Sequence, residues 1–322
     1  MNVLSLYDGI SGIQQVFKNL GIKPDRVFVS EIDKTCEMVT MHHFPDSIML
    51  GPVENIDGYQ LPEIDLLIGG PPCQSFSTAK FGPKENFNSP NGNLVLEYIR
   101  LFKEIRPKWF LMENVVMGTK PRDFISAQLG LDPHLIDSQI FIPQKRRRYY
   151  WTNLLPVAED IEHIPELSIL NETESKTHLS EYLDKEVDDK YFMKPLNMKY
   201  IFSDKGFLKK SLANPKVAHT ITRTMSKRHR ANADTYITED IYPKDRTNVR
   251  ALTPKEVSRL QGYPDDYLEM LSDTKIYNLM GNSFCLPVIE LIINNMKYVE
   301  DFEVKENKDT YQLKLDIRIS VE

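Results

Sequence analysis

Residues 69–77 read Gly-Gly-Pro-Pro-Cys-Gln-Ser-Phe-Ser, and they include the residue best suited to nucleophilic chemistry, Cys73. The cysteine follows two prolines at the end of an apolar run, Ile64–Ile68. Prolines restrict the backbone, and an ionised thiol is a strong nucleophile. An unpaired cysteine is more often a small buried hydrophobic residue, but the polar sequence after Cys73 argues against that alternative. The pattern predicts a nucleophilic cysteine beside a cleft.

Charged side chains follow at the ends of two later segments. The apolar run Trp109–Met112 leads directly into Glu113, which predicts a carboxylate at a strand end beside the cysteine. Gln144–Arg148 contains Arg146 and Arg148, which point in the same direction if the segment is extended. Taken alone, such arginines are more often a solvated surface patch. Next to a cysteine and an acid, they become candidates to promote ionisation of the thiol.

A glycine-containing turn near the N-terminus is a candidate cofactor site. Leu6–Gly12 combines the end of a strand, two glycines and the start of a helix, where backbone N–H groups favour an anionic group. This turn alone is a weak signal, because many nucleotide-binding folds contain one. Glu31 ends the next apolar segment, where an acid can accept hydrogen bonds from a ribose. Together they indicate a cofactor that contains adenosine.

These candidates need a fold that gathers strand ends, and the first half of the chain has that pattern. Short apolar segments alternate with amphipathic ones, which predicts an α/β fold with a parallel sheet covered by helices on both faces. Ligands of such sheets bind beyond the carboxyl ends of the strands. The predicted strands are Val3–Tyr7, Arg26–Ser30, Ile64–Ile68, Lys108–Met112, Leu135–Asp137 and Tyr149–Thr152, and the predicted helices are Ser11–Leu20, Lys34–His42 and Leu94–Ile105.

The second half is less regular. Polar sequence without a clear period follows residue 155, whereas Thr253–Gln261 and Pro287–Met296 again have helical patterns. Tyr311–Val321 alternates strictly between apolar and polar residues, which predicts a half-buried strand that could also pair across a dimer. The predicted domains are a catalytic and cofactor-binding domain at 1–154, a smaller target-recognition lobe at 155–249, a return to the catalytic domain at 250–299 and a C-terminal extension at 300–322.

Composition excludes several classes of protein. The chain has 322 residues, 41% hydrophobic and 27% charged, as in an ordinary globular protein. Its three cysteines are far apart, which argues against a disulfide scaffold and a zinc site, so we expect no metal. No apolar stretch approaches the ~18 residues of a membrane span, and the N-terminus lacks a basic leader. We therefore expect a cytoplasmic protein that does not bind membranes.

The net charge of −6 argues mildly against a nucleic-acid partner, but charge is segregated along the chain. Residues 157–192 contain eleven acidic residues and three lysines, whereas residues 205–250 contain eleven basic and four acidic residues. One lobe could therefore present a basic face to DNA. Ordinary solvated surface charge is the alternative explanation.

With these motifs in place, the sequence resembles the C5-cytosine DNA methyltransferases. The family's catalytic signature, PPCQ-x-FS, stands unchanged at Pro71–Ser77. The other family motifs occur in order as the glycine motif at Tyr7–Gly12, the ribose acid Glu31, ENV at Glu113–Val115, Q-x-R-x-R at Gln144–Arg148, R-x-L-x-P-x-E-x-x-R-L-Q-G-Y-P at Arg250–Pro264 and G-N-S-x-x-x-P at Gly281–Pro287. Only the middle lobe and the tail lie outside the match, and the core looks like the compact de novo type.

The resemblance implies the fold and the reaction. The fold is the Rossmann-like, mostly parallel sheet of class I S-adenosylmethionine-dependent methyltransferases. In the reaction, the Cys73 thiolate attacks C6 of a cytosine that has been flipped out of the duplex, and C5 then takes the methyl group of S-adenosylmethionine. Glu113 bonds to N3 and the exocyclic amine, and Arg146 or Arg148 holds O2. Gln144 supports the loop, and Thr78–Asn93 is expected to close over the base.

The cofactor and DNA contacts are also implied by the resemblance. The family usually has an Asp where Pro52 stands, so Glu54 or a backbone carbonyl replaces its contact to the adenine amino group, or affinity is weaker. Ile32 and Val53 are expected to sandwich the adenine ring. The cofactor-binding candidates are Tyr7, Asp8, Gly9, Ile10, Gly12, Glu31, Ile32, Val53, Pro72, Leu94, Asn282, Ser283 and Phe284, and the DNA-binding candidates are Ser77, Arg223, Lys227, Arg228 and Arg230.

Double-stranded DNA is thus the expected partner, with a cognate restriction endonuclease as a further candidate. Two alternatives stay open: the same chemistry on tRNA cytosines, and a non-catalytic DNA-binding relative. The intact Cys73, Glu113 and arginines argue against the second alternative.

Overall fold

The computed structural model describes residues 1–72, 90–156, 167, 169–170, 172–193, 214–228, 234–238 and 249–296, with the backbone alone at 90–93. The chain divides into two compact units. Unit 1 comprises Met1–Ile136, Arg147–Pro165 and Glu290–Glu322, and unit 2 comprises Asp137–Arg146 and Glu166–Ile289. These units differ in their bounds from the functional domains expected above, whose assignment stays a prediction. The expected strand Tyr311–Val321 and the expected lid up to residue 89 lie outside the described residues.

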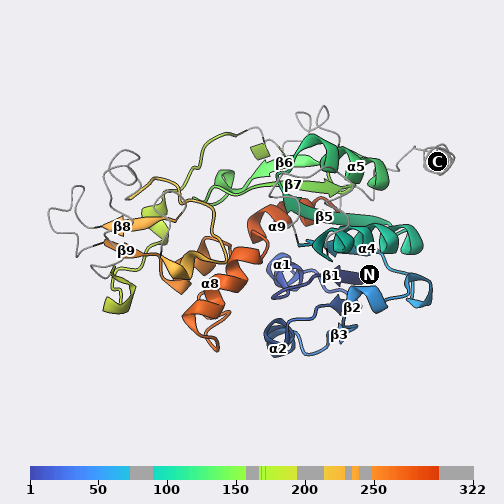
Figure 1. The fold of residues 1–322 in the computed structure, drawn as a ribbon, viewed down its shortest axis with the longest axis horizontal. Helices are drawn as coiled ribbons and strands as arrows, with labels where there is room; N and C mark the ends of the chain where they lie inside the picture. Colours follow the sequence, from blue (N-terminus) through green and yellow to red (C-terminus); the bar gives the residue numbers. More distant parts are fainter. Residues whose placement is uncertain are drawn as a thin grey trace. The chain divides into compact units, whose positions relative to one another are not determined.

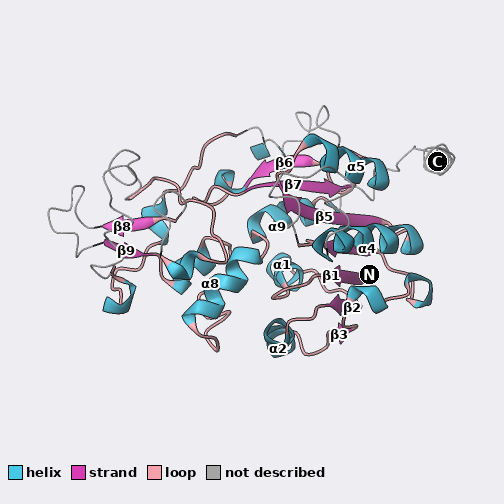
Figure 2. Ribbon diagram, in the orientation of Figure 1, coloured by secondary structure: helices cyan, strands magenta, loops and turns pink. Residues whose placement is uncertain are grey.

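A seven-stranded sheet of order β3-β2-β1-β4-β5-β7-β6 organises unit 1 (Figures 1 and 2). Its strands are β1 (Asn2–Leu6), β2 (Arg26–Ser30), β3 (Ile48–Met49), β4 (Leu66–Gly69), β5 (Trp109–Val115), β6 (His134–Asp137) and β7 (Arg147–Thr152). Strands β1 to β5 are parallel, and β7 runs antiparallel to β5. The predicted α/β fold with a mostly parallel sheet is confirmed.

The strand order places the predicted site. From β1 the chain moves outward through β2 and β3, and then returns to pair β4 with the other side of β1. The strand order therefore reverses between β1 and β4, and ligands bind at such a reversal, beyond the carboxyl ends of the strands. The glycine turn follows β1, and the Pro71-Pro72 segment follows β4.

Helices flank the sheet because the strands are apolar on both faces. The helices are α1 (Gly12–Leu20), α2 (Lys34–His43), α4 (Pro90–Ile105), α5 (Thr119–Leu129) and α9 (Leu286–Asn294), which runs from unit 2 into unit 1. Leu4, Leu67 and Phe110 share a hydrophobic core with Tyr98 of α4. The alternate residues Val3, Leu66 and Leu111 are fully buried as well. Because side chains alternate along a strand, both faces are covered.

The sequence predicted most of these elements, with ends shifted by a few residues. Helix α1 follows the 3.6-residue period of Ile13, Val16 and Phe17, and Gly21 ends it with a positive φ of 68°. Helix α5 was not predicted. Its buried positions include Pro121 and Ser126 besides Ile125 and Leu129, so its apolar pattern is weak.

Unit 2 contains a two-stranded antiparallel sheet of β8 (Tyr236–Thr238) and β9 (Val249–Ala251), with α7 (Pro254–Arg259) and α8 (Asp273–Asn282). Helix α7 begins as predicted, because Thr253 and Glu256 form a capping box and Pro254 occupies the first turn. Contrary to the expectation from the sequence, residues 273–294 are long and apolar enough to cross a membrane by length and composition. Of the most apolar 18-residue window within them, 56% is buried inside the protein, as in a core helix.

Candidate active site

The turn after β1 has the tight backbone that the glycine motif predicts. Tyr7, Gly9 and Ser11 have positive φ angles of 54°, 60° and 56°. Such angles are strained for residues other than glycine, so the surrounding contacts must stabilise the turn. The hydroxyl of Tyr7 donates to the carbonyl oxygen of Leu94 at 2.5 Å, and this contact joins two predicted cofactor-binding residues. A Cβ added to Gly9 would meet no atom within 4 Å, so the turn is open at this position.

Asp8 supports this turn from inside. Its carboxylate is 6% exposed and accepts hydrogen bonds from the hydroxyls of Ser5 and Ser11, with Thr40 at 3.4 Å. Burial raises the pKa of Asp8 to about 6, against the opposing effect of the hydroxyl donors. Because its oxygens are engaged with these hydroxyls, Asp8 stabilises the conformation of the turn.

Glu31 links the glycine turn to the end of β2. Its carboxylate accepts hydrogen bonds from the backbone N–H of Gly9 at 2.8 Å, of Ile32 at 2.7 Å and of Asp33 at 2.8 Å. A carboxylate has about four acceptor positions, so capacity for a further donor remains. The arrangement suits the predicted contact to a ribose.

The predicted adenine sandwich has one open side. Ile32 is 70% exposed, whereas Val53 is 3% exposed and belongs to the hydrophobic core of unit 1. Pro52 is the N-cap residue of the short helix η1 (Val53–Asn55), in which Val53 is the buried position. In this structure Ile32 therefore offers apolar surface to a ligand, and Val53 does not.

At the end of β5, Glu113 forms an ion pair with Arg148. Arg148 Nε lies 2.9 Å from Glu113 Oε1, and both side chains are 13% exposed. The antiparallel register sets Glu113 opposite Tyr150 and Val115 opposite Arg148. Glu113 and Arg148 are therefore diagonal neighbours on the same face of the sheet. The structure thus brings together a predicted catalytic acid and a predicted catalytic arginine.

Asn114 is a residue of this site that sequence reasoning did not single out, although it is the central residue of the ENV motif. It is 1% exposed, and its Nδ2 donates to the carbonyl oxygen of Pro71 at 3.2 Å. It thereby ties the end of β5 to the segment that precedes Cys73. Cys73 and Ser77 lie outside the described residues, whereas Pro72 is described and half-buried.

Arg146 has different partners from Arg148, although only one residue separates them. Its side chain is 3% exposed and lies in unit 2, where it donates to the carbonyl oxygens of Ile221, Gly281 and Ser283 at 2.7–3.4 Å. The expectation of a matched pair assumed an extended segment, but β7 begins only at Arg147.

The Arg250–Pro264 motif is largely structural. Arg250 donates two parallel hydrogen bonds of 2.9 Å to Glu256, and their side chains are 8% and 0% exposed. Glu256 also accepts from the backbone N–H of Thr253 and Asp184. Gln144, fully buried, donates to the carbonyl oxygen of Leu260 and accepts from the N–H of Ile221.

The predicted DNA-binding residues of unit 2 differ in their exposure and in the partners of their side chains. Arg223 and Lys227 are exposed. Arg228 instead donates to the carbonyl oxygen of Lys190 at 2.8 Å and lies 5.7 Å from the ring centre of Tyr191, so it is part of a local cation–π arrangement. Arg230 lies outside the described residues. Asn282 is exposed, and Ser283 and Phe284 are half-buried beside it.

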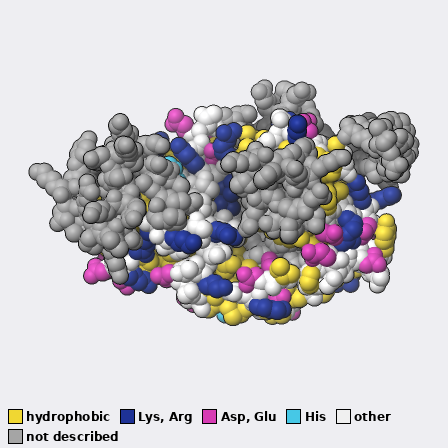
Figure 3. Space-filling view, viewed as in Figure 1, with side chains coloured by type: hydrophobic (Ala, Val, Ile, Leu, Met, Phe, Trp, Pro, Cys, Tyr) yellow, Lys and Arg dark blue, Asp and Glu magenta, His cyan; other side chains and the backbone are white. Residues whose placement is uncertain are grey.

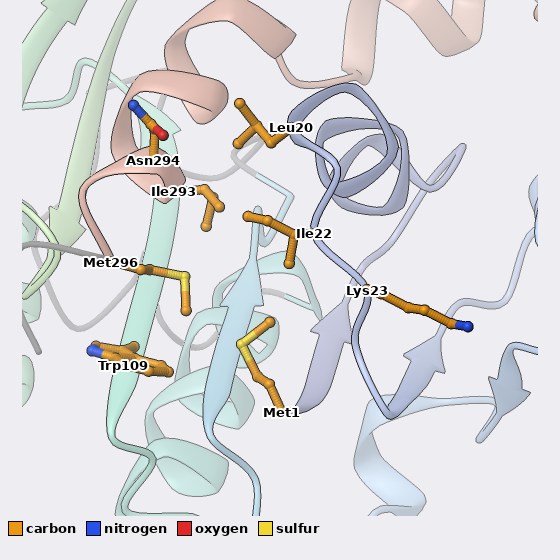
Figure 4. A pocket seen from close by; sticks show the side chains of 8 residues that line it. All are labelled: Met1, Leu20, Ile22, Lys23, Trp109, Ile293, Asn294 and Met296. Atoms are coloured by element: carbon orange, nitrogen blue, oxygen red, sulfur yellow. The ribbon is translucent and has the colours of Figure 1, made fainter.

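Figure 3 shows basic and acidic side chains interspersed on the coloured part of the face in view. In unit 1, Arg100 forms ion pairs with Glu97 and Glu104. A cavity of about 380 Å³ also lies in unit 1 (Figure 4). Met1 and Trp109, at the amino ends of β1 and β5, line it with Leu20, Ile22 and Ile293. It is therefore at the opposite end of the sheet from the glycine turn and Glu113.

Comparison with known proteins covers most of the chain. Residues 1–298 match the family model described as C-5 cytosine-specific DNA methylase. The chain is 31% identical to the type II methyltransferase M1.ScrFI of Lactococcus lactis subsp. cremoris, over 91% of this chain and 77% of that protein. It is 31% identical to the type II methyltransferase M.SsoII of Shigella sonnei, over 90% and 78%.

A solved structure shares the fold. The Entamoeba histolytica methyltransferase EhMeth superposes with a TM-score of 0.74 at 19% identity, over 94% of this chain and 99% of that one. At this identity the likeness concerns the fold alone.

Proposed function

The chain belongs to the C-5 cytosine-specific DNA methylase family and is a DNA (cytosine-5-)-methyltransferase; we propose that Cys73, Glu113 and Arg148 perform its chemistry with S-adenosylmethionine as methyl donor. The observation that carries this assignment is the Glu113–Arg148 pair at the end of β5, next to Asn114, which holds the Pro71 carbonyl. The acid, the arginine and the segment that leads to the nucleophile belong to neighbouring strand ends of one sheet.

The residues divide the reaction among them. The Cys73 thiolate adds to C6 of cytosine, and the electron pair of the C5–C6 bond becomes available at C5. Glu113 in its protonated form donates a hydrogen bond to N3, which accepts electron density during the attack. Arg148 holds the carboxyl group of Glu113 in place, and we propose that it also donates a hydrogen bond to O2. Once C5 carries the methyl group, its proton passes to solvent, the electron pair of that C–H bond re-forms the C5–C6 double bond, and the C6–S bond breaks to release Cys73 as a thiolate.

The residues at the ends of β1 and β2 fit the methyl donor. Glu31 retains acceptor capacity for a ribose hydroxyl, Ile32 exposes an apolar face for adenine, and the turn at Gly9 has room for close approach. When bound there, S-adenosylmethionine supplies an electrophilic methyl group. Tyr7 and Leu94 support the turn through their hydrogen bond.

DNA is the substrate, and we propose that Arg223 and Lys227 contact it, because both are exposed and basic. The named relatives are type II methyltransferases of bacteria. By analogy we propose a cytoplasmic enzyme that works beside a cognate restriction endonuclease.

Bisulfite sequencing of DNA and tRNA from cells that express the wild-type protein or Cys73→Ser tests the assignment. We expect protected cytosines at one short DNA sequence with the wild type and none with the variant. Protection in tRNA alone would establish the alternative substrate. If neither nucleic acid is protected, and if 5-fluorocytosine duplexes form no covalent adduct, the enzymatic assignment is wrong.

A further inference from the structure

Arg146 connects two segments of unit 2 that are more than fifty residues apart in sequence. Its Nη1 donates to the carbonyl oxygen of Ile221 at 3.3 Å, and its Nη2 donates to the carbonyl oxygen of Ser283 at 2.7 Å. Both nitrogens also lie 3.4 Å from the carbonyl oxygen of Gly281. A planar guanidinium with five N–H donors can span separate acceptors in this way.

The same two segments are in direct backbone contact. A Cβ added to Gly281 would lie 2.1 Å from the backbone nitrogen of Arg223 and 2.4 Å from the carbonyl carbon of Thr222. Only glycine permits this approach. Gln144 accepts from the N–H of Ile221 at 3.1 Å on the neighbouring side. Residues 221–223 and 281–283 therefore form a tightly packed unit, which we call the junction.

Each half of the junction contains or adjoins residues that are expected to bind a different ligand. This inference therefore rests on the proposed function. Arg223 is an exposed candidate for DNA binding, and Asn282–Phe284 are candidates for cofactor binding. Because the two halves are packed backbone to backbone and share the hydrogen bonds of Arg146, a shift of one half on ligand binding must be accommodated by the other half.

We propose that Arg146 is a positioning residue that couples DNA binding to cofactor binding through the junction. This role excludes a contact to the flipped base, because Arg146 is 3% exposed and its Nη1 and Nη2 donate to backbone carbonyls. Arg148 is the arginine of the pair that serves the chemical step.

Isothermal titration of the full chain measures the coupling. The dissociation constant of S-adenosylhomocysteine is determined with and without a duplex that carries the sequence found by bisulfite sequencing, and the duplex is titrated with and without S-adenosylhomocysteine. The two ratios must agree, because coupling is reciprocal. For the wild type we expect a ratio of at least about 5, the lower end of typical couplings.

Two variants separate the roles of the arginines. Arg146→Lys keeps the charge but cannot span the three carbonyls, so we expect its ratio to fall to within twofold of 1. Its single-turnover methylation rate with both ligands saturating should stay within threefold of the wild type. Arg148→Lys should show the reverse, with the ratio retained and the single-turnover rate lowered.

Two further variants control for a general loss of stability. Val257→Ala creates a cavity at a fully buried position of α7, and Arg146→Met removes the hydrogen bonds of the guanidinium. If both variants lose similar thermal stability and only Arg146→Met loses the ratio, general loosening is not the cause. The proposal is wrong if the active wild type shows no coupling, if Arg146→Lys retains it, or if Arg146→Lys loses the chemical step instead. A wild type without methylation activity would overturn the proposed function, which is a separate result.

Discussion

Each unit contains an arginine–glutamate pair with an N–O distance of 2.9 Å, yet the two pairs have different surroundings. In unit 2, Glu256 is fully buried and accepts two hydrogen bonds from Arg250 and two from backbone N–H groups. In unit 1, Glu113 and Arg148 are each 13% exposed and are joined through Nε of the arginine.

The comparison shows how a structural ion pair differs from one available to a ligand. The four hydrogen bonds to Glu256 use the whole acceptor capacity of a carboxylate, so nothing remains for a substrate. Glu113 keeps capacity beyond its contact to Arg148, at a strand end where ligands of such sheets bind. Acceptor capacity and location therefore indicate function better than the presence of the ion pair.

Replacing Glu256 should cause the largest effect, and it should be on stability. Glu256→Gln leaves Arg250 buried without a countercharge, and we expect a loss of about 3–5 kcal/mol in the free energy of unfolding, measured by urea denaturation. The double variant Arg250→Met/Glu256→Gln removes both charges, keeps a side-chain oxygen for the N–H groups of Thr253 and Asp184, and should recover much of that loss. If Glu256→Gln is as stable as the wild type, the Arg250–Glu256 pair does not have the structural role that distinguishes it from the Glu113–Arg148 pair.

Glu113→Gln should instead lower the rate. General acid–base contributions are typically 10²–10⁴-fold, and we expect a kcat about 10²–10³ lower with little change in unfolding free energy. Single-turnover methylation measures the loss of rate, and urea denaturation of the same preparations measures the unfolding free energy. A stability loss comparable to that of Glu256→Gln would assign Glu113 a mainly structural role.

The sequence predicted the parts of this comparison that depend on strand ends. Glu113 was expected because an apolar run leads into it, and Arg148 was expected together with Arg146, on the assumption that both stand in an extended segment. The different partners of Arg146 could not be predicted, since they depend on where β7 begins and on carbonyls distant in sequence. The burial of Val53 was missed for a similar reason: alternation says nothing about a residue in a short 3-10 turn. Strands β8 and β9 have three residues each, too few to display a period.

Asp8 extends the comparison to a carboxylate whose partners are hydroxyls. Burial raises the pKa of Asp8 to about 6 from 3.8. Because the folded-state value is the higher one, its contribution to stability is fully present below pH 3.8 and is lost as the pH rises through about 6. Relative to the wild type, Asp8→Asn should gain up to about 3 kcal/mol in unfolding free energy between pH 4 and pH 7.

Urea denaturation of wild type and Asp8→Asn at several pH values gives this difference. Ser5→Ala provides the matched variant, because the Ser5 hydroxyl lowers the pKa of Asp8. Its removal should move the pH-dependent loss of stability to higher pH. If the difference in unfolding free energy between wild type and Asp8→Asn does not change with pH, the pKa of Asp8 is not raised in the folded protein.

The smallest effect is expected for the amide that joins β5 to the segment before Cys73. Asn114→Ala leaves the Pro71 carbonyl without its donor, at a cost of about 1–2 kcal/mol. Asn153 is the matched control, because its amide bonds to the backbone of Phe110 and Lys108 at the other end of β5. If Asn114 positions the nucleophile, Asn114→Ala should lower kcat about tenfold, equivalent to about 1.4 kcal/mol, whereas Asn153→Ala should reduce stability alone. Equal kcat values for the two variants would mean that the amide stabilises the sheet without positioning Cys73.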